Sequence, residues 1–249
     1  EQEITSAISY VTQDTIPRVM VLQGHGELDA NATAVLEDFL SGNNFEVRYF
    51  ELSDTDVTLE PTDLLMILSP QRDFMDTELK TLTDFAAAGG SMFITCDYSD
   101  NVDNMPNYQS LLRSYGFQPL NGMVVASTEE SGTYYDEYPI LLLPYMQRSA
   151  ATLQLVEGNS DTLLLAGSRA FAQPEEGDNN LTTQVVLSSG YKAYLRDLSD
   201  GSDSIAQQDD DQVGPFALAL LSQRVTTAGN VSKAFVLGCS TVLTDSQVY

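Results

Sequence analysis

The sequence predicts one α/β domain built on a mostly parallel, doubly wound sheet, and three observations support this prediction. A chain of 249 residues that is 43% hydrophobic can bury a single sizeable core. In its first half, continuous apolar runs of strand length alternate with stretches of helical periodicity. Only a few residues connect these runs, which is typical of β-α-β units whose right-handed crossovers place helices on both faces of a parallel sheet.

The strands are predicted from continuous apolar runs, because a parallel strand is buried on both faces. RVMVLQ and DLLMILS are the clearest of these runs, and Pro61 and Pro70 bound the second one. The predicted strands cover residues 18–23, 45–50, 63–69, 91–96 and, later in the chain, 184–188 and 233–237.

The helices are predicted from apolar residues three and four positions apart, with glycine after the last of them. Gly42, the Gly89-Gly90 pair and Gly116 mark the ends of three helices. Helices and strands together make residues 1–120 the regular half of the domain. The predicted helices of this half cover residues 1–12, 29–40, 76–88 and 107–115.

The second half of the chain is less regular. Residues 121–190 mix short apolar runs with polar turns, and we expect a small β-rich elaboration and further sheet strands there. Residues 197–212 contain few apolar side chains and are expected to form an acidic, mobile surface loop. Residues 213–249 are expected to close the single domain with an apolar helix over 214–225 and a last strand.

The charge of the chain argues against several kinds of partner. Lys+Arg 11 against Asp+Glu 36 gives a formal net charge of -25, which repels nucleic-acid phosphates and anionic lipid headgroups. Nucleic acids and membrane surfaces are therefore not expected as ligands. No apolar run approaches the ~20 residues that span a bilayer, so these residues are expected to be soluble.

The two cysteines, Cys96 and Cys239, each end an apolar run that is predicted as a strand. Buried free thiols are the simpler interpretation, because free cysteine behaves as a small apolar residue. A disulfide stays open if the two strands are neighbours in the sheet.

Several segments, in order along the chain, match the pattern of a known family: AISYVT (7–12), VMVLQGHGE (19–27), the stretch 63–95 with its SP, EL and GG motifs, GPFALAL (214–220) and AFVLGCSTVLTD (234–245). With these segments the chain resembles the auxiliary, substrate-binding-like component of gliding-motility-associated ABC transporters, over nearly its whole length.

This resemblance implies a context and a fold. The domain would be extracytoplasmic, tethered to the cell membrane by flanking transmembrane helices outside these 249 residues, and would work beside an ABC-type permease and ATPase. The fold would be flavodoxin-like and similar to class I glutamine amidotransferases, usually without their chemistry.

Polar side chains follow the predicted strands, at the edge where open parallel sheets bind ligands. This edge is rich in carboxylates, which favours a cation, a small polar or sugar-like ligand or a basic partner surface over an anion. The candidate ligand-binding residues are His25, Glu27, Asp54, Arg72, Asp97 and Ser240.

The segment Gly24-His25-Gly26-Glu27 contains the single histidine of the chain. Its glycines allow a sharp turn that would direct the imidazole and the carboxylate into the crevice. A plain turn, in which His25 and Glu27 satisfy backbone groups between a strand and a helix, is the simpler interpretation. Ligand binding and catalysis stay open beside it.

An amidotransferase-like hydrolase would use His25 with Cys239 or with a nearby carboxylate. Such chemistry requires a nucleophilic cysteine on a strand-to-helix elbow, and neither cysteine has the flanking glycines of an elbow. The preferred hypothesis is therefore a domain without catalytic residues that binds a ligand or a partner.

Metal and cofactor motifs are also missing from the sequence. Zinc requires about four ligands, typically His or Cys at fixed spacing, and phosphate loops require a glycine-rich motif that is absent. The aspartates of residues 197–212 lack the ordered spacing of a calcium loop, although calcium binding by this segment stays open. We expect neither a bound metal nor a cofactor.

Overall fold

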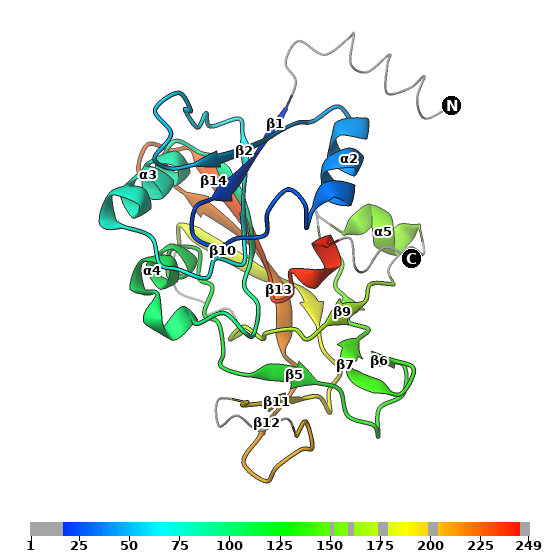
Figure 1. The fold of residues 1–249 in the computed structure, drawn as a ribbon. Coiled ribbons are helices and arrows are strands. Elements are labelled where there is room, and N and C mark those ends of the chain that lie inside the picture. The colour runs from blue at the N-terminus through cyan, green and yellow to red at the C-terminus, as the bar shows by residue number, and fades with distance from the viewer. Residues whose placement is uncertain (1–16, 150–151, 159–161, 174–178, 199–203, 245–249) are drawn as a thin grey trace.

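An eight-stranded sheet forms the centre of the computed structural model, which describes residues 17–149, 152–158, 162–173, 179–198 and 204–244 (Figure 1). The strands of this sheet are β1 (Arg18–Gln23), β2 (Glu46–Glu51), β3 (Leu64–Leu68), β4 (Ser91–Thr95), β8 (Tyr145–Met146), β10 (Leu181–Ser188), β13 (Ala217–Val225) and β14 (Val231–Leu237). They lie in the order β2-β1-β3-β4-β14-β13-β10-β8.

The pairing of these strands confirms the predicted mostly parallel sheet. β2, β1, β3, β4 and β14 pair in parallel in that order, which is the 2-1-3-4-5 arrangement of flavodoxin-like folds. β13, β10 and β8 then extend the sheet with antiparallel pairing. The central parallel strands are mostly apolar because both of their faces are covered, as the four buried residues of β3 from Leu65 to Leu68 show.

Helices cover both faces of the parallel part, as a doubly wound sheet requires (Figure 1). α3 and α4 pack on one face, whereas α2 packs on the other. The helices are α2 (Ala34–Gly42), α3 (Asp76–Ala87), α4 (Pro106–Ser114), the short α5 (Leu153–Glu157) and the 3-10 turns η1 (Val102–Asn104) and η2 (Thr241–Leu243).

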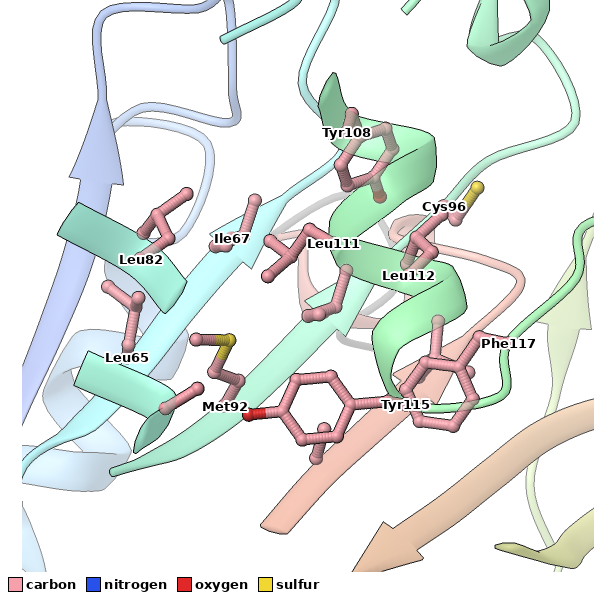
Figure 2. Packing of buried hydrophobic residues seen from close by; sticks show 14 of the residues in the cluster. Leu65, Ile67, Leu82, Met92, Cys96, Tyr108, Leu111, Leu112, Tyr115 and Phe117 are labelled. Atoms are coloured by element: carbon pink, nitrogen blue, oxygen red, sulfur yellow. The ribbon is translucent and has the colours of Figure 1, made fainter. Parts of the chain in front are cut away.

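The larger part of the core lies between the sheet and the helices α3 and α4. Figure 2 shows Ile67 of β3 and Met92 of β4 facing Leu82 of α3 and Leu111 of α4. All four side chains are buried. A fully buried leucine, isoleucine or methionine contributes about 1.5–3 kcal/mol relative to an exposed one, so this layer fixes how the helices sit on the sheet.

The β-rich elaboration predicted over residues 121–190 is present as two small sheets beside the main one, although two strands of the first sheet come from residues 194–196 and 212–213, outside the predicted bounds. Its strands cover the face of β13 and β14 that α3 and α4 leave free, with Val124, Leu142 and Leu165 in the same core cluster as Leu218 and Leu237. The first sheet consists of β12 (Gln212–Val213), β11 (Tyr194–Arg196) and β5 (Met123–Val125), and the second of β6 (Tyr134–Tyr135), β7 (Tyr138–Leu142) and β9 (Leu165–Ala166).

The helix predicted over 214–225 is wrong, because this segment forms β13. β13 lies between β14 and β10, where the other strands and both layers bury Ala217 to Leu220. A short apolar run has the same appearance in a buried helix and in a strand that is covered on both faces. The strand is therefore selected by its neighbours in the sheet and not by a local pattern.

The helix boundaries also differ from the predictions in one place. The helix expected over 29–40 begins at Ala34, because the Asp29 carboxylate accepts the N–H groups of Asn31 and Ala32 and holds a turn instead. The left-handed residue after this helix is Asn44, with φ 66°, and not Gly42. Gly89 and Gly116 do adopt the left-handed conformation that ends α3 and α4.

The helix predicted over 1–12, three short stretches of the elaboration and residues 245–249 of the closing segment lie outside the described residues. Residues 199–203 of the acidic segment lie outside them as well. In the described part of that segment, the carboxylate of Asp211 lies 3.7 Å from the guanidinium of Arg196, and both side chains are buried. Across the parts of the chain that the structure describes, no helix has the length and apolar character needed to span a membrane.

Candidate functional site

The carboxyl ends of β1, β3, β4 and β14 meet at one edge of the main sheet. After β1 the chain crosses to α2 on one face, and after β3 it crosses to α3 on the other. The loops 24–29 and 69–73 therefore diverge between adjacent strands. Such a switch point is where open parallel sheets bind ligands.

The loop after β1 places the His25 ring between two carboxylates. Nδ1 lies 3.2 Å from Oε1 of Glu27, and Nε2 lies 3.1 Å from Oε2 of Glu78. Gly24 and Gly26 adopt φ angles of 109° and 83°, which only glycine reaches without strain, and so allow the sharp turn. Because both ring nitrogens are bound within the protein, the imidazole has no nitrogen left for a substrate.

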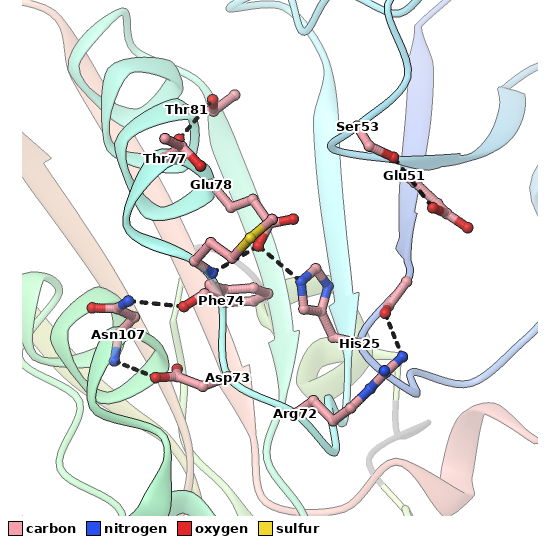
Figure 3. Close-up of polar contacts among 12 residues, drawn as sticks. His25, Glu51, Ser53, Arg72, Asp73, Phe74, Thr77, Glu78, Thr81 and Asn107 are labelled. Carbon is pink, nitrogen blue, oxygen red and sulfur yellow. Dashed lines mark hydrogen bonds and ion pairs between the residues drawn. The ribbon is translucent and has the colours of Figure 1, made fainter.

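Glu78 connects this loop to the start of α3, as Figure 3 shows. Its Oε2 accepts the N–H of Met75 at 2.7 Å, so the carboxylate caps the helix while it contacts the ring. Phe74 packs edge-on against the imidazole with the ring centroids 4.8 Å apart. The ring is therefore held by an aromatic contact as well as by two carboxylates, and His25 is only 8% exposed.

Backbone hydrogen bonds join the loops after β1 and β3. The carbonyl oxygen of His25 accepts the N–H groups of Gln71 and Arg72, at 2.8 and 3.0 Å. The guanidinium of Arg72 returns a bond of 2.7 Å to the carbonyl oxygen of Gly24 (Figure 3). The loop after β3 thus holds the glycine turn in place, which supports the simpler interpretation of Gly24 to Glu27 as a structural turn.

A second polar cluster lies at the ends of β4 and β14. The carboxylate of Asp97 accepts both the N–H and the hydroxyl of Ser240, the former at 2.5 Å. The carboxylate of Asp100 accepts the Ser69 hydroxyl and the Gln71 amide, each at 2.7 Å. Gln71 therefore links this cluster to the loop that holds His25.

Burial changes the pKa of both aspartates in this cluster. It raises the pKa of Asp97 above its ordinary value, although the hydrogen bonds from Ser240 oppose this effect. It raises the pKa of Asp100 to about 6, while the bonds from Ser69 and Gln71 oppose the shift. The two side chains tie the ends of three strands together through hydrogen bonds. Because they are poorly hydrated there, ionisation of either carboxyl group costs free energy.

A buried arginine holds the loop between these aspartates. The guanidinium of Arg169 donates hydrogen bonds of 2.8–3.1 Å to four backbone carbonyl groups, and the side chain is 2% exposed. The acceptors are the carbonyl oxygens of Asp97, Tyr98, Asp100 and Leu120. Arg169 thus attaches the elaboration to the edge of the main sheet.

The structure brings most of the predicted site residues into two neighbouring clusters. His25 and Glu27 lie in the first cluster beside Arg72, and Asp97 and Ser240 form part of the second. Asp54 joins neither cluster, because it follows β2 and its carboxylate accepts the N–H of Glu51.

Sequence reasoning missed several residues of these clusters, among them Ser69, Gln71, Glu78 and Arg169. Glu78 lies 53 positions from His25, and the signal that could have identified it is its place in the first turn of α3, where a glutamate can cap a helix. Arg169 has no such signal, since an isolated arginine in an irregular segment shows nothing of the carbonyl groups around it.

The proposed pair of His25 and Cys239 is not formed. β3 and β4 lie between β1 and β14, and the Cys239 thiol contacts the carbonyl oxygen of Ala166 and the hydroxyl of Thr241. Cys96 and Cys239 are both free and buried, although β4 and β14 are neighbours. Burial raises the pKa of both thiols, that of Cys96 to about 12.

Within the described ranges of the chain, no three His, Cys, Asp or Glu side chains are grouped so that they could hold a metal ion. The carboxylates of the two clusters instead bind hydrogen-bond donors of the protein itself. Neither cluster therefore offers a set of free ligands.

The fold is similar to those of solved structures with low sequence identity. The mmIFT52 N-terminal domain superposes with a TM-score of 0.63 and 16% identity, covering 92% of this chain and 89% of that one. A cytoplasmic protein from Salmonella typhimurium gives a TM-score of 0.47 and 11% identity, covering 88% and 86%. A glutamine amidotransferase from Thermotoga maritima gives 0.42 and 12%, covering 90% and 76%. The first of these likenesses shows a shared fold alone.

No curated protein matches the chain significantly. The sequence pattern of the family described as "ABC-type uncharacterized transport system" matches residues 16–228. The matched region begins just before β1 and ends just before β14, so it includes most of the main sheet and the whole elaboration. The chain therefore belongs to this family of ABC transport auxiliary proteins, as its resemblance predicted.

Proposed function

We propose that the chain is a non-catalytic, extracytoplasmic binding domain of an auxiliary protein in an ABC-type transport system. The observation that carries this proposal is the state of the side chains at the carboxyl edge of the sheet. The ring nitrogens of His25 and the carboxylates of Asp97 and Asp100 are bound to groups of the protein itself. Such an edge has a fixed shape but few groups available for breaking bonds.

A catalytic alternative lacks support from this geometry. A hydrolase of the amidotransferase type needs a thiolate within reach of a general base. The thiol of Cys239 is buried with a raised pKa, and its contacts are with Ala166 and Thr241. A nearby carboxylate does not replace the missing pair, because Glu27 and Glu78 already flank the ring of His25.

The exposed part of this edge is suited to a partner protein. Arg72 and Asp54 are exposed, and Met75, three positions after Arg72, is 62% exposed. Methionine and arginine are both enriched at protein interfaces. In this proposal the buried residues of the two clusters support the surface, while Asp54 and Arg72 contact the partner.

We propose the permease of the transport system as the partner. The ATPase of the same system would drive this permease. The resemblance to gliding-motility-associated transporters supports this assignment, together with flanking membrane helices that would tether the domain to the cell membrane. The net charge of -25 favours a basic partner surface and keeps the domain away from anionic lipid headgroups.

Site-specific photo-cross-linking in the full-length protein tests the partner. A photoreactive residue in place of Arg72 or Asp54 should cross-link the permease in membranes that contain the transporter. The same residue in place of the exposed Thr227 serves as the control, because Thr227 lies in the turn between β13 and β14 at the opposite edge of the sheet. Equal cross-linking from both edges, or none from Arg72 and Asp54, would contradict the proposal.

Protease treatment of spheroplasts tests the location. If the domain is extracytoplasmic, protease added outside intact spheroplasts should digest it while a cytoplasmic marker stays whole. Digestion only after lysis would place the domain on the other side of the membrane.

A further inference from the structure

A cavity of about 790 Å³ lies where β10 and β8 end the main sheet. It is lined by β8, by residues Val185 and Ser188 of β10, and by the loop that includes Tyr191. Since β3, β4, β14 and β13 separate β1 from β10, this cavity is separate from the site at His25. Its volume is within the range of ~300–1,000 Å³ that small-molecule sites occupy.

Two tyrosines form an aromatic part of the cavity lining. The rings of Tyr145 and Tyr191 lie with their centroids 6.3 Å apart and their planes tilted by 47°. These residues are 43% and 68% exposed, so folding leaves much of their ring surface in contact with water. Exposed tyrosines that lie together can bind the apolar face of a ligand and donate a hydrogen bond from the hydroxyl.

Neutral hydrogen-bonding groups complete the lining. The amide nitrogen of Gln147 donates to the hydroxyl of Ser188 at 3.2 Å, which holds these two groups together on the wall. The side chain of Gln173 adds a second amide. An amide offers both donors and an acceptor, and a hydroxyl offers both roles, so these groups match ligand hydroxyl groups well.

The described residues that line the cavity carry little net charge. The chain contains 36 Asp+Glu, yet no carboxylate lies among the described residues that line this cavity. The guanidinium of Arg148, which does line it, is paired with the carboxylate of Glu157. An anionic ligand would meet the repulsion of the whole chain without a free cation to bind it, and a cation would find no carboxylate on the described wall.

We propose that this cavity binds a neutral oligosaccharide. Tyr145 and Tyr191 pack against the C–H faces of the sugar rings, while Gln147, Gln173 and Ser188 bind the hydroxyl groups. This inference goes beyond the proposed function and does not rest on it, because the cavity would bind a sugar whether or not Arg72 and Asp54 engage a permease. It also places the predicted sugar-like ligand beside β8 and β10, four strands away from the loop of His25.

Calorimetric titration of the 249-residue chain tests the proposal. The probes are cellotetraose, mannotetraose and N-acetylchitotetraose, with tetragalacturonate as the charged comparison. At least one neutral probe should bind with a Kd of about 1 mM or below, and tetragalacturonate should bind at least about tenfold more weakly. Failure of all three neutral probes to bind, or equal binding of the charged one, would overturn the proposal.

Matched variants locate the binding. Tyr145→Ala and Tyr191→Ala should each raise the Kd of the probe by about three- to tenfold, because each removes one aromatic face. Tyr138→Ala is the control, since Tyr138 is 58% exposed but lies on β7 outside the lining. All three side chains are exposed, so thermal unfolding should show that each variant is folded. A probe that the two cavity variants bind as tightly as Tyr138→Ala would show that the sugar binds elsewhere.

Discussion

His25 and Glu78 are 53 residues apart in the chain and meet at 3.1 Å, where the loop after β1 touches the first turn of α3. The same carboxylate oxygen of Glu78 accepts the N–H of Met75. One side chain therefore joins a helix cap to the glycine turn at the switch point of the sheet. This relationship explains why a turn that has a catalytic appearance in the sequence has a structural role in the fold.

Replacement of Glu78 should test this role. Glu78→Ala removes the cap and one partner of the imidazole, so the free energy of unfolding should fall by about 1–2 kcal/mol. Glu78→Gln should lose less, because the amide oxygen can still accept the N–H of Met75. Urea denaturation measures both. Thr77→Ala, on the exposed side of the same turn, should change stability by about 0.5 kcal/mol or less, and an equal loss in Thr77→Ala would contradict the role given to Glu78.

The sequence predicted the parallel strands well because their signal is local. A strand covered on both faces must be apolar along its length, and β1 and β3 have this property between turn residues. The same signal failed for β13, whose apolar run between Pro215 and Val225 is compatible with a helix until β14 and β10 are placed beside it. Topology, and not periodicity, determines that element.

The sequence predicted the region of the site but not the contacts within it. The carboxyl ends of parallel strands share an edge, so His25, Asp97 and Ser240 could be assigned to one region from the strand order alone. Which side chains contact one another there depends on residues from α3 and the elaboration. Glu78 and Arg169 come from those elements, and the sequence around them contains no pattern that identifies their partners.

Asp100 should make stability depend on pH. An unfolded aspartate titrates near its ordinary pKa of 3.8, whereas burial raises the pKa of Asp100 to about 6. Between these values the native state holds a proton that the unfolded state has lost. The contribution of this group to stability is therefore full below pH 3.8, decreases as pH rises from 3.8 to about 6, and is lost above about 6. Burial raises the pKa of Asp97 in the same direction, so its contribution has the same sign.

Asp100→Asn separates this contribution from the rest of the chain. The variant cannot ionise at this position, so its stability should decrease less than that of the wild type as pH rises from about 4 to about 7. It should also be less stable at low pH, because an amide nitrogen replaces an oxygen that accepts the Asp97 N–H or the Gln71 amide. Urea denaturation across this pH range measures both effects, and parallel pH profiles would contradict the assignment.

Arg169 should be among the most sensitive positions of the domain. Arg169→Ala leaves four backbone carbonyl groups without this donor and leaves a void where a buried side chain stood, so the free energy of unfolding should fall by about 3 kcal/mol or more. Arg169→Lys should recover part of this loss, since an ammonium can bind some of the carbonyl groups but lacks the planar fork. Arg148→Ala is the control: its side chain is 67% exposed, and losing its ion pair should cost about 1 kcal/mol or less. A loss at Arg169 no larger than at Arg148 would show that the buried guanidinium does not hold the loop.

The two thiols should be inert in the native protein. Alkylation requires the thiolate, and burial both raises the pKa of Cys96 and Cys239 and blocks access of the reagent. Iodoacetamide at pH 8 should therefore modify neither residue over a period in which both react completely in urea, as mass spectrometry of the intact chain would show. His25→Ala should leave this result unchanged, because the imidazole lies against Glu27 and Glu78 and not against a thiol. Rapid modification of Cys239 in the native chain, lost in His25→Ala, would instead reveal an activated nucleophile and restore the enzyme hypothesis.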